Sequence, residues 1–166
     1  MNLRGKAHKF GDSINTDYII SGKYKFKTLD MNELAKHVME DLDPGFCSKI
    51  TTGDFIVAGK NFGLGSSREQ APLAIKHADI SAVIARSFAR IFFRNAINTG
   101  LPILICRDAD RIDDGDELEV DLSSGLIINR TKEEELKAEK LPPIMIRILE
   151  EGGLAEYLIR HGGFEV

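Results

Sequence analysis

The sequence predicts an α/β fold in which helices cover a mostly parallel sheet. Three short apolar segments, 55–59, 81–88 and 101–107, have the continuous hydrophobic character of strands that are buried on both faces. Two helical stretches, at about 69–77 and 89–100, separate them. This alternation is typical of βαβ units with right-handed crossovers, so we expect the three strands to be parallel.

The N-terminal part should add a strand and a helix in front of these units. Residues 6–10 are consistent with a short strand, and a polar loop follows over 11–17. The segment 30–43 predicts a helix, because its apolar residues recur every three or four positions. Asp30 is the expected N-cap, and Glu33 stands three residues later, where it would complete a capping box.

The C-terminal part, from about residue 116, changes character. Residues 116–131 alternate apolar and polar side chains around a Ser-Gly turn, which predicts an exposed β-hairpin. The charge-rich segment 132–140 is expected to be a solvated connection, and 142–163 should end in a short helix. We find no internal repeat, so the simplest organisation is a single domain over residues 1–166.

Composition and charge exclude several functional classes. A net charge of −4 argues against nucleic acid or an anionic membrane as the main partner. No segment has the apolar length of a membrane span or a signal peptide, so we expect a soluble, cytoplasmic protein. Cys47 and Cys106 lie far apart, which excludes a zinc-ribbon or ferredoxin spacing and favours two reduced, mostly buried thiols. The histidines also lack metal-binding spacing; they are His8, His37, His77 and His161.

The segment "NFGLGSSREQAP", residues 61–72, follows one predicted strand and opens a predicted helix. It lacks the lysine of a phosphate-binding P-loop. A dinucleotide-binding loop needs a third glycine where Arg68 stands, and a hydrolase nucleophile elbow needs glycine where Glu69 stands. All three of these familiar uses are therefore rejected.

What remains is a candidate anion site. The planar guanidinium of Arg68 can bind a carboxylate through two hydrogen bonds. A serine next to that charge and to a helix N-terminus, Ser66 or Ser67, would have its ionised form stabilised and could act as a base. The alternative is that both serines only cap the helix and that Arg68 pairs with a surface acid.

Three separated segments resemble one known family. The segments "GDSINTDYI", "GKNFGLGSSREQAPLAIKHADISAVIARSFARIFFRNAINTGLPIL" and "LPPIMIRILEEGGLAEYL" occur in the same order in the swivelling domain of the aconitase superfamily. As a separate chain of this length, the sequence resembles the family of small subunits of 3-isopropylmalate dehydratases, also called isopropylmalate isomerases. The resemblance spans nearly the whole chain.

The resemblance implies a three-layer β/β/α fold with a mostly parallel sheet. It also implies a two-chain hydro-lyase, a heterodimer or heterotetramer, whose large subunit carries a [4Fe-4S] cluster on its own three cysteines. The implied reaction removes water from a hydroxy-diacid and adds it back with the hydroxyl on the adjacent carbon. The cluster would act as the Lewis acid, and this chain would bind none by itself and would supply the base.

The same resemblance assigns roles to residues at matching positions. Ser66 corresponds to the base, carried as an alkoxide, and Ser67 and Arg68 would bind a substrate carboxylate. Thr16 and Asp17 match a threonine–aspartate pair near the family's active site. The alternative for Asp17 is a purely turn-forming role.

Substrate choice is expected to depend on the segment 21–30, which aligns with the family's substrate-recognition loop. Phe26 occupies the position where an apolar residue favours an isopropyl branch; a shift of one residue would place Lys25 or Lys27 there, and either could bind a carboxylate. The main hypothesis is therefore interconversion of 2- and 3-isopropylmalate in leucine biosynthesis. Homoaconitate and 2,3-dimethylmalate are alternative substrates, and a stand-alone anion-binding regulatory module is a less favoured function.

Arg90 and Arg94 lie four residues apart on one predicted helix. We interpret them as structural residues that pair with carboxylates or lie at a subunit interface.

Overall fold

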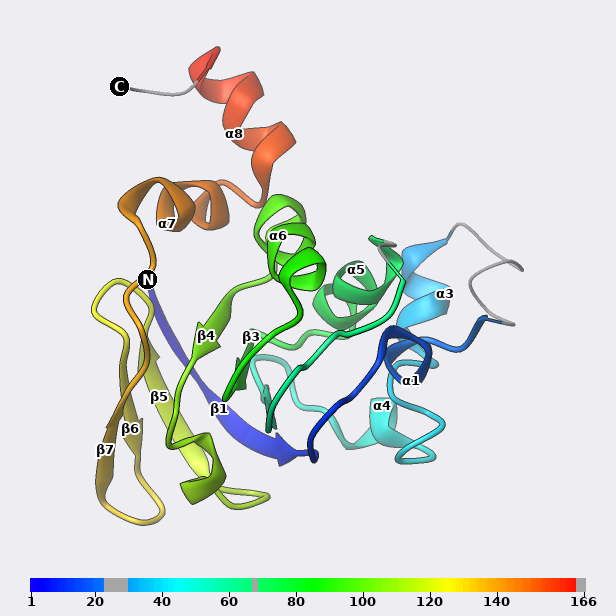
Figure 1. Ribbon diagram of the computed structural model, residues 1–166, viewed down its shortest axis with the longest axis vertical. Helices are drawn as coiled ribbons and strands as arrows, with labels where there is room; N and C mark the ends of the chain where they lie inside the picture. The colour runs from blue at the N-terminus through cyan, green and yellow to red at the C-terminus, as the bar shows by residue number, and fades with distance from the viewer. Residues whose placement is uncertain (23–29, 67–68, 164–166) are drawn as a thin grey trace.

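The computed structural model describes residues 1–22, 30–66 and 69–163. In these residues a seven-stranded sheet has the order β4-β3-β2-β1-β5-β6-β7 (Figure 1). The strands are β1 (Asn2–Lys9), β2 (Phe55–Ala58), β3 (Ala82–Ala85), β4 (Ile103–Ile105), β5 (Glu117–Asp121), β6 (Leu126–Asn129) and β7 (Glu134–Lys137).

The sheet has a parallel part and an antiparallel part that share β1. Strands β1 to β4 pair in parallel, with Ala7 opposite Phe55, Phe55 opposite Ala82, and Val83 opposite Ile103. This confirms the expected βαβ units. Strand β1 also pairs antiparallel with β5, which continues into β6 and β7. The expected hairpin is therefore β5–β6, and it extends the sheet.

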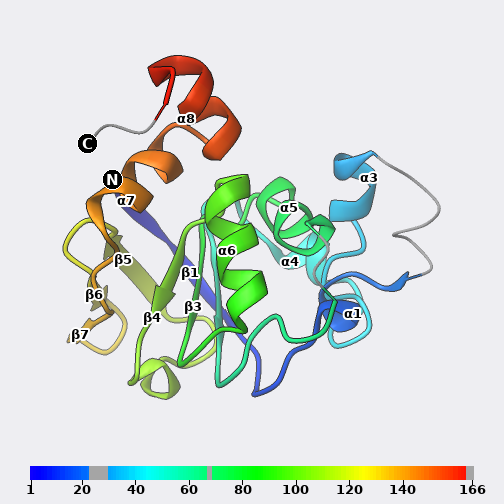
Figure 2. The same cartoon turned by 45° about the horizontal axis from the view of Figure 1, so that its top comes forward.

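Helices α5 (Gln70–His77) and α6 (Arg90–Thr99) connect β2 to β3 and β3 to β4. Both crossovers run in the same direction along the sheet, so right-handed connections place both helices on the same face, where Figures 1 and 2 show them side by side. The buried face of α5 contains alanines at 71 and 74, which let the helix lie close to its neighbours. Shorter helices complete the N-terminal half: α1 (Thr16–Ile19), α3 (Met31–Ala35) and α4 (Phe46–Lys49).

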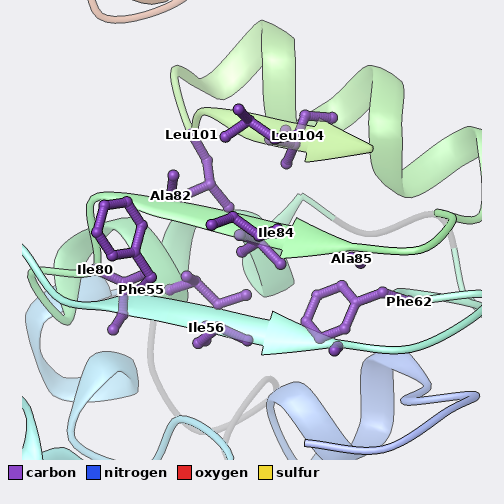
Figure 3. Packing of buried hydrophobic residues seen from close by; sticks show 14 of the residues in the cluster. Phe55, Ile56, Phe62, Ile80, Ala82, Ile84, Ala85, Leu101 and Leu104 are labelled. Carbon is purple, nitrogen blue, oxygen red and sulfur yellow. The ribbon is translucent and has the colours of Figure 1, made fainter. Parts of the chain in front are cut away.

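The core lies between the parallel strands and these helices. Every residue of β2 and β3 is buried, which explains why these strands have continuous rather than alternating apolar sequences. Figure 3 shows Phe55 and Ile56 of β2 next to Ala82 and Ile84 of β3. Leu104 of β4 closes this side of the core (Figure 3).

The prediction of a helix over residues 30–43 is wrong after Ala35. Asp30 is its N-cap, and the side-chain Oδ1 accepts the Asn32 N–H at 3.0 Å, but α3 ends at Ala35. Met39 has a left-handed φ of 57° and donates its N–H to the Ile19 carbonyl at 2.8 Å. Residues 36–42 form consecutive turns instead of a helix. These turns bury Val38 and Met39, two of the apolar residues whose spacing had suggested a helix.

One C-terminal expectation is also corrected. The segment predicted to be a solvated connection contains β7, because Leu136 is buried while its charged neighbours face outward at the sheet edge. The expected short helix at the end of segment 142–163 is confirmed as α8 (Leu154–His161), and a further helix, α7 (Pro143–Glu150), precedes it. They are separated by Gly152 and Gly153, which both have positive φ. Gly100 caps the C-terminus of α6 with φ 86°, as predicted.

A hydrogen bond between His8 and the buried Asp54 joins the first two parallel strands. The Asp54 carboxylate accepts the His8 Nε2–H at 2.7 Å, the Thr51 N–H at 2.9 Å and the Lys6 N–H at 3.0 Å. Burial by itself raises the pKa of Asp54, but these hydrogen bonds outweigh it and lower the pKa below its ordinary value. No sequence pattern predicts this contact, since the two residues are 46 positions apart.

Candidate active site

The candidate site is built from loops that follow the parallel strands at their carboxyl ends. The loop after β1 and the loop after β2 run side by side: Ser13 N–H bonds to the Lys60 carbonyl at 2.7 Å, and Thr16 N–H bonds to the Leu64 carbonyl at 2.8 Å. Asp12 Oδ1 accepts the Lys60 N–H at 2.7 Å. Ligands of open α/β sheets bind at this edge.

A third loop, which follows β3 and leads into α6, is hydrogen-bonded to the loop after β2. Phe62 N–H bonds to the Ser87 carbonyl at 3.0 Å, and Ala89 N–H bonds back to the Phe62 carbonyl at 2.9 Å. The Phe62 ring packs edge-on against Phe92 of α6, with centroids 5.3 Å apart. Residues 61–66 are thus held by the loop after β1, the loop after β3 and helix α6, which are distant from one another in the sequence.

Gly63 is required by this arrangement. Its φ is +86°, which L-residues with side chains rarely adopt, and a Cβ at this position would overlap the ring of Phe92. Its N–H also bonds to the Ile14 carbonyl at 2.7 Å. The glycine therefore allows the loop to pass close to both α6 and the loop after β1.

Thr16 and Ser66 meet at the end of these loops. Their hydroxyl oxygens are 3.1 Å apart, and Thr16 Oγ1 also accepts the Ser66 N–H at 3.2 Å. Thr16 is only 2% exposed, whereas Ser66 is exposed at the surface. A hydroxyl has one hydrogen and two lone pairs, so Thr16 can accept from the Ser66 backbone and still donate to the Ser66 oxygen.

Asp17 follows Thr16 in the first turn of α1, with an exposed side chain. Asn15, which the sequence reasoning missed, is the N-cap of α1, and its Oδ1 accepts the Tyr18 N–H at 3.0 Å. The pattern Asn15–Thr16–Asp17 before a short helix could have suggested this cap. Asn15 therefore caps α1, and the turn-forming role of Asp17 remains an alternative prediction.

The helix after Ser66 begins later than a serine cap requires. The N-cap of α5 is Glu69, which makes no side-chain capping hydrogen bond, and the Ser66 hydroxyl is next to Thr16 instead. Capping by Ser66 is therefore wrong. The remaining predicted site residues lie outside the described residues; they are Ser67, Arg68, Lys25, Phe26 and Lys27.

The described residues of this chain do not fit an iron–sulfur cluster. Such a cluster is held by several cysteine thiolates, and Cys47 in α4 and Cys106 after β4 are both free thiols on different elements. Burial raises the pKa of the Cys106 thiol, which keeps it protonated. In the part of the chain that the structure describes, no three His, Cys, Asp or Glu side chains converge as a metal site.

Comparison with known proteins shows the family of this chain. The family model of the aconitase C-terminal domain matches residues 16–107, from Thr16 through α6 and β4. The chain is 60% identical over 166 residues to the 3-isopropylmalate dehydratase small subunit 2 of Archaeoglobus fulgidus, with 100% of both chains covered. The chain belongs to the aconitase C-terminal domain family, among the small subunits of 3-isopropylmalate dehydratase.

Other members of this small-subunit family also match over nearly their whole length. The small subunit 1 of Thermotoga maritima is 50% identical over 162 residues, 98% of each chain. The crystal structure of a 3-isopropylmalate dehydratase from Methanocaldococcus jannaschii superposes with a TM-score of 0.93 at 50% identity, covering 98% of this chain and 96% of the other. The expected α/β fold of the swivelling-domain type is confirmed. Among the described residues, no helix has the length and apolar character needed to span a bilayer.

Proposed function

We propose that the whole chain, residues 1–166, acts as a single swivelling domain in a two-chain 3-isopropylmalate dehydratase of the cytoplasm. The enzyme interconverts 2- and 3-isopropylmalate by dehydration and rehydration, a step of leucine biosynthesis. Support comes from the full-length similarity to relatives that carry this name and from the position of the Thr16–Ser66 pair. Two-chain assembly is supported by the description of those relatives as small subunits.

The observation that carries the proposal is the short contact between Thr16 and the exposed Ser66. Dehydration requires a base that removes a proton from the carbon next to a carboxylate. In our proposal Ser66 Oγ takes that proton, and the Thr16 hydroxyl donates a hydrogen bond to the Ser66 oxygen. Such a bond is stronger when the oxygen is charged, so it stabilises the form of Ser66 that acts as the base.

Carboxylate binding is assigned to the residues next to this pair. Arg68 is two residues after Ser66, and consecutive Cα atoms are about 3.8 Å apart, so its guanidinium can reach a substrate held at Ser66. We propose that Arg68 and Ser67 bind a substrate carboxylate and that Asp17, one residue after Thr16, orients this group. Phe26 would contact the isopropyl branch, with Lys25 and Lys27 on either side of it in the sequence.

This chain supplies only part of an active site. Ser66 is exposed, and a serine oxygen is far from ionised at neutral pH unless the site is closed and positively charged. We propose that the large subunit covers Ser66 in a heterodimer or heterotetramer and carries the [4Fe-4S] cluster, since the described donors of this chain do not fit one.

The test is reconstitution of the enzyme from separately purified subunits. We expect no activity from either chain alone, and hydration of isopropylmaleate after mixing this chain with the cluster-bearing large subunit. Substantial activity of this chain alone would contradict the two-chain proposal. A clearly higher kcat/KM for homoaconitate or 2,3-dimethylmalate than for 3-isopropylmalate would replace the proposed substrate and leave the assembly in place.

A further inference from the structure

An apolar groove lies between α6 and α7, on the side of the molecule where α8 is attached. Its volume is about 330 Å³. The floor is formed by aromatic and aliphatic side chains of both helices, and the rim is polar. The floor residues are Phe93, Ile97, Ile144, Met145 and Ile148, and the rim residues are Arg90, Arg94 and Asn98.

The two arginines of the rim determine what could occupy the groove. Arg90 and Arg94 are exposed and one helical turn apart on α6. Neither forms an ion pair with a carboxylate in the described parts of the chain. Of the two roles that the sequence suggested for them, pairing with a carboxylate of the same chain is not found there. An apolar floor with a cationic rim fits an aliphatic side chain that has a carboxylate next to it.

Helix α8 presents that combination on its outer face. Ile159 is 85% exposed, the highest value among the exposed large hydrophobic side chains of the described residues. Glu156, three residues earlier and therefore on the same face, is also exposed. The opposite face of α8 is anchored by the fully buried Tyr157. Because that anchor fixes the helix, Ile159 points away from its own core, and Figures 1 and 2 show α8 standing out from the body.

We propose that α8 of one molecule docks in the α6–α7 groove of a second copy. Ile159 would lie on the apolar floor and Glu156 next to Arg90 or Arg94. Helix α8 contacts both α6 and α7 of its own chain, so the projecting face and the groove are neighbours on one surface. Each of two molecules can therefore dock the outer face of its α8 in the groove of the other about a two-fold axis, which gives a closed dimer. The proposal does not depend on the activity, since none of these residues belongs to the Thr16–Ser66 site.

The test measures the mass of the full chain in solution by sedimentation velocity between 1 and 200 μM. We expect a dimer, and we expect Ile159→Asp to raise the dimer dissociation constant at least tenfold. Leu42→Asp is the matched control, because Leu42 is an exposed aliphatic residue on another part of the surface, 39% exposed. Circular dichroism verifies that both variants are folded.

Charge reversal tests the rim separately. Arg90→Glu with Arg94→Glu should also weaken the dimer at least tenfold, and adding Glu156→Arg to that variant should restore part of the affinity. A wild-type chain that is monomeric at 200 μM overturns the proposal. The proposal is also overturned if Ile159→Asp leaves the dimer dissociation constant unchanged. The same holds if Leu42→Asp raises that constant as much as Ile159→Asp does. If Ile159→Asp weakens only the binding of the large subunit, the outer face of α8 belongs to that interface and docking of a second copy is wrong.

Discussion

Thr16 Oγ1 contacts Ser66 twice, at 3.1 Å from its hydroxyl oxygen and at 3.2 Å from its backbone nitrogen, although the two residues are 50 positions apart in the chain. Thr16 is buried at the start of α1, whose position is set by the Asn15 cap and by the Thr16 N–H bond to Leu64. Ser66 is an exposed residue whose backbone N–H is bonded to Thr16. One buried hydroxyl therefore both positions the proposed base and can stabilise its charged form.

Ser66→Ala should reduce kcat of the reconstituted enzyme by about 10²- to 10⁴-fold, the usual contribution of a positioned base. The Thr16–Ser66 backbone bond does not need the serine hydroxyl, so the variant should fold and bind the large subunit normally. Steady-state kinetics and co-purification measure the two effects. Ser48→Ala is the control, because Ser48 only donates to the Gly45 carbonyl in α4. A Ser66→Ala enzyme with most of its activity would exclude Ser66 as the base.

Thr16→Val should lower kcat by about 10- to 100-fold and change KM little, because it removes a hydrogen bond to the charged base while keeping a side chain of similar shape. Thr16→Ser keeps the hydroxyl and should recover most of the lost rate. Loss of the acceptor for Ser66 N–H should also destabilise the fold by about 1 kcal/mol. If Thr16→Ser is as slow as Thr16→Val, a hydroxyl at position 16 does not restore the rate, and the proposed stabilisation of the Ser66 oxygen by the Thr16 hydroxyl is wrong.

The sequence predicted the elements that depend on local pattern and missed those that depend on distant partners. The parallel strands were predictable because strands buried on both faces need continuous apolar residues. The segment 61–72 was a candidate site because it follows such a strand, and only the family resemblance favoured Ser66 over Ser67. Strand β7 was not predictable, since its charges are typical of a solvated edge and only Leu136 is buried. The contact between Thr16 and Ser66 is formed by tertiary packing, so only the family resemblance had connected the two residues.

Gly63→Ala should destabilise the protein more than Gly115→Ala. Both glycines have φ +86°, so both substitutions impose the backbone cost of a left-handed alanine, about 1 kcal/mol. A Cβ at Gly115 meets no atom within 4 Å, whereas one at Gly63 overlaps Phe92. The additional clash should bring the loss for Gly63→Ala to about 2–4 kcal/mol. Urea unfolding measures both; equal losses would mean that the loop moves away from α6 freely.

Asp54→Asn should destabilise the protein by about 1–3 kcal/mol at neutral pH, because the ionised carboxylate accepts bonds from His8, Thr51 and Lys6. The folded-state pKa of Asp54 is lowered, so its stabilisation is fully present above the unfolded pKa of about 3.9 and is lost as pH falls through the folded value. The difference in unfolding free energy between wild type and Asp54→Asn should accordingly shrink below about pH 4. Urea titrations at pH 3, 5 and 7 measure this, with Asp114→Asn, at an exposed carboxylate that accepts the Lys9 N–H, as the comparison variant. A difference that stays constant from pH 7 to pH 3 would show that the Asp54 charge contributes nothing, and that the loss comes from the shape of the asparagine alone.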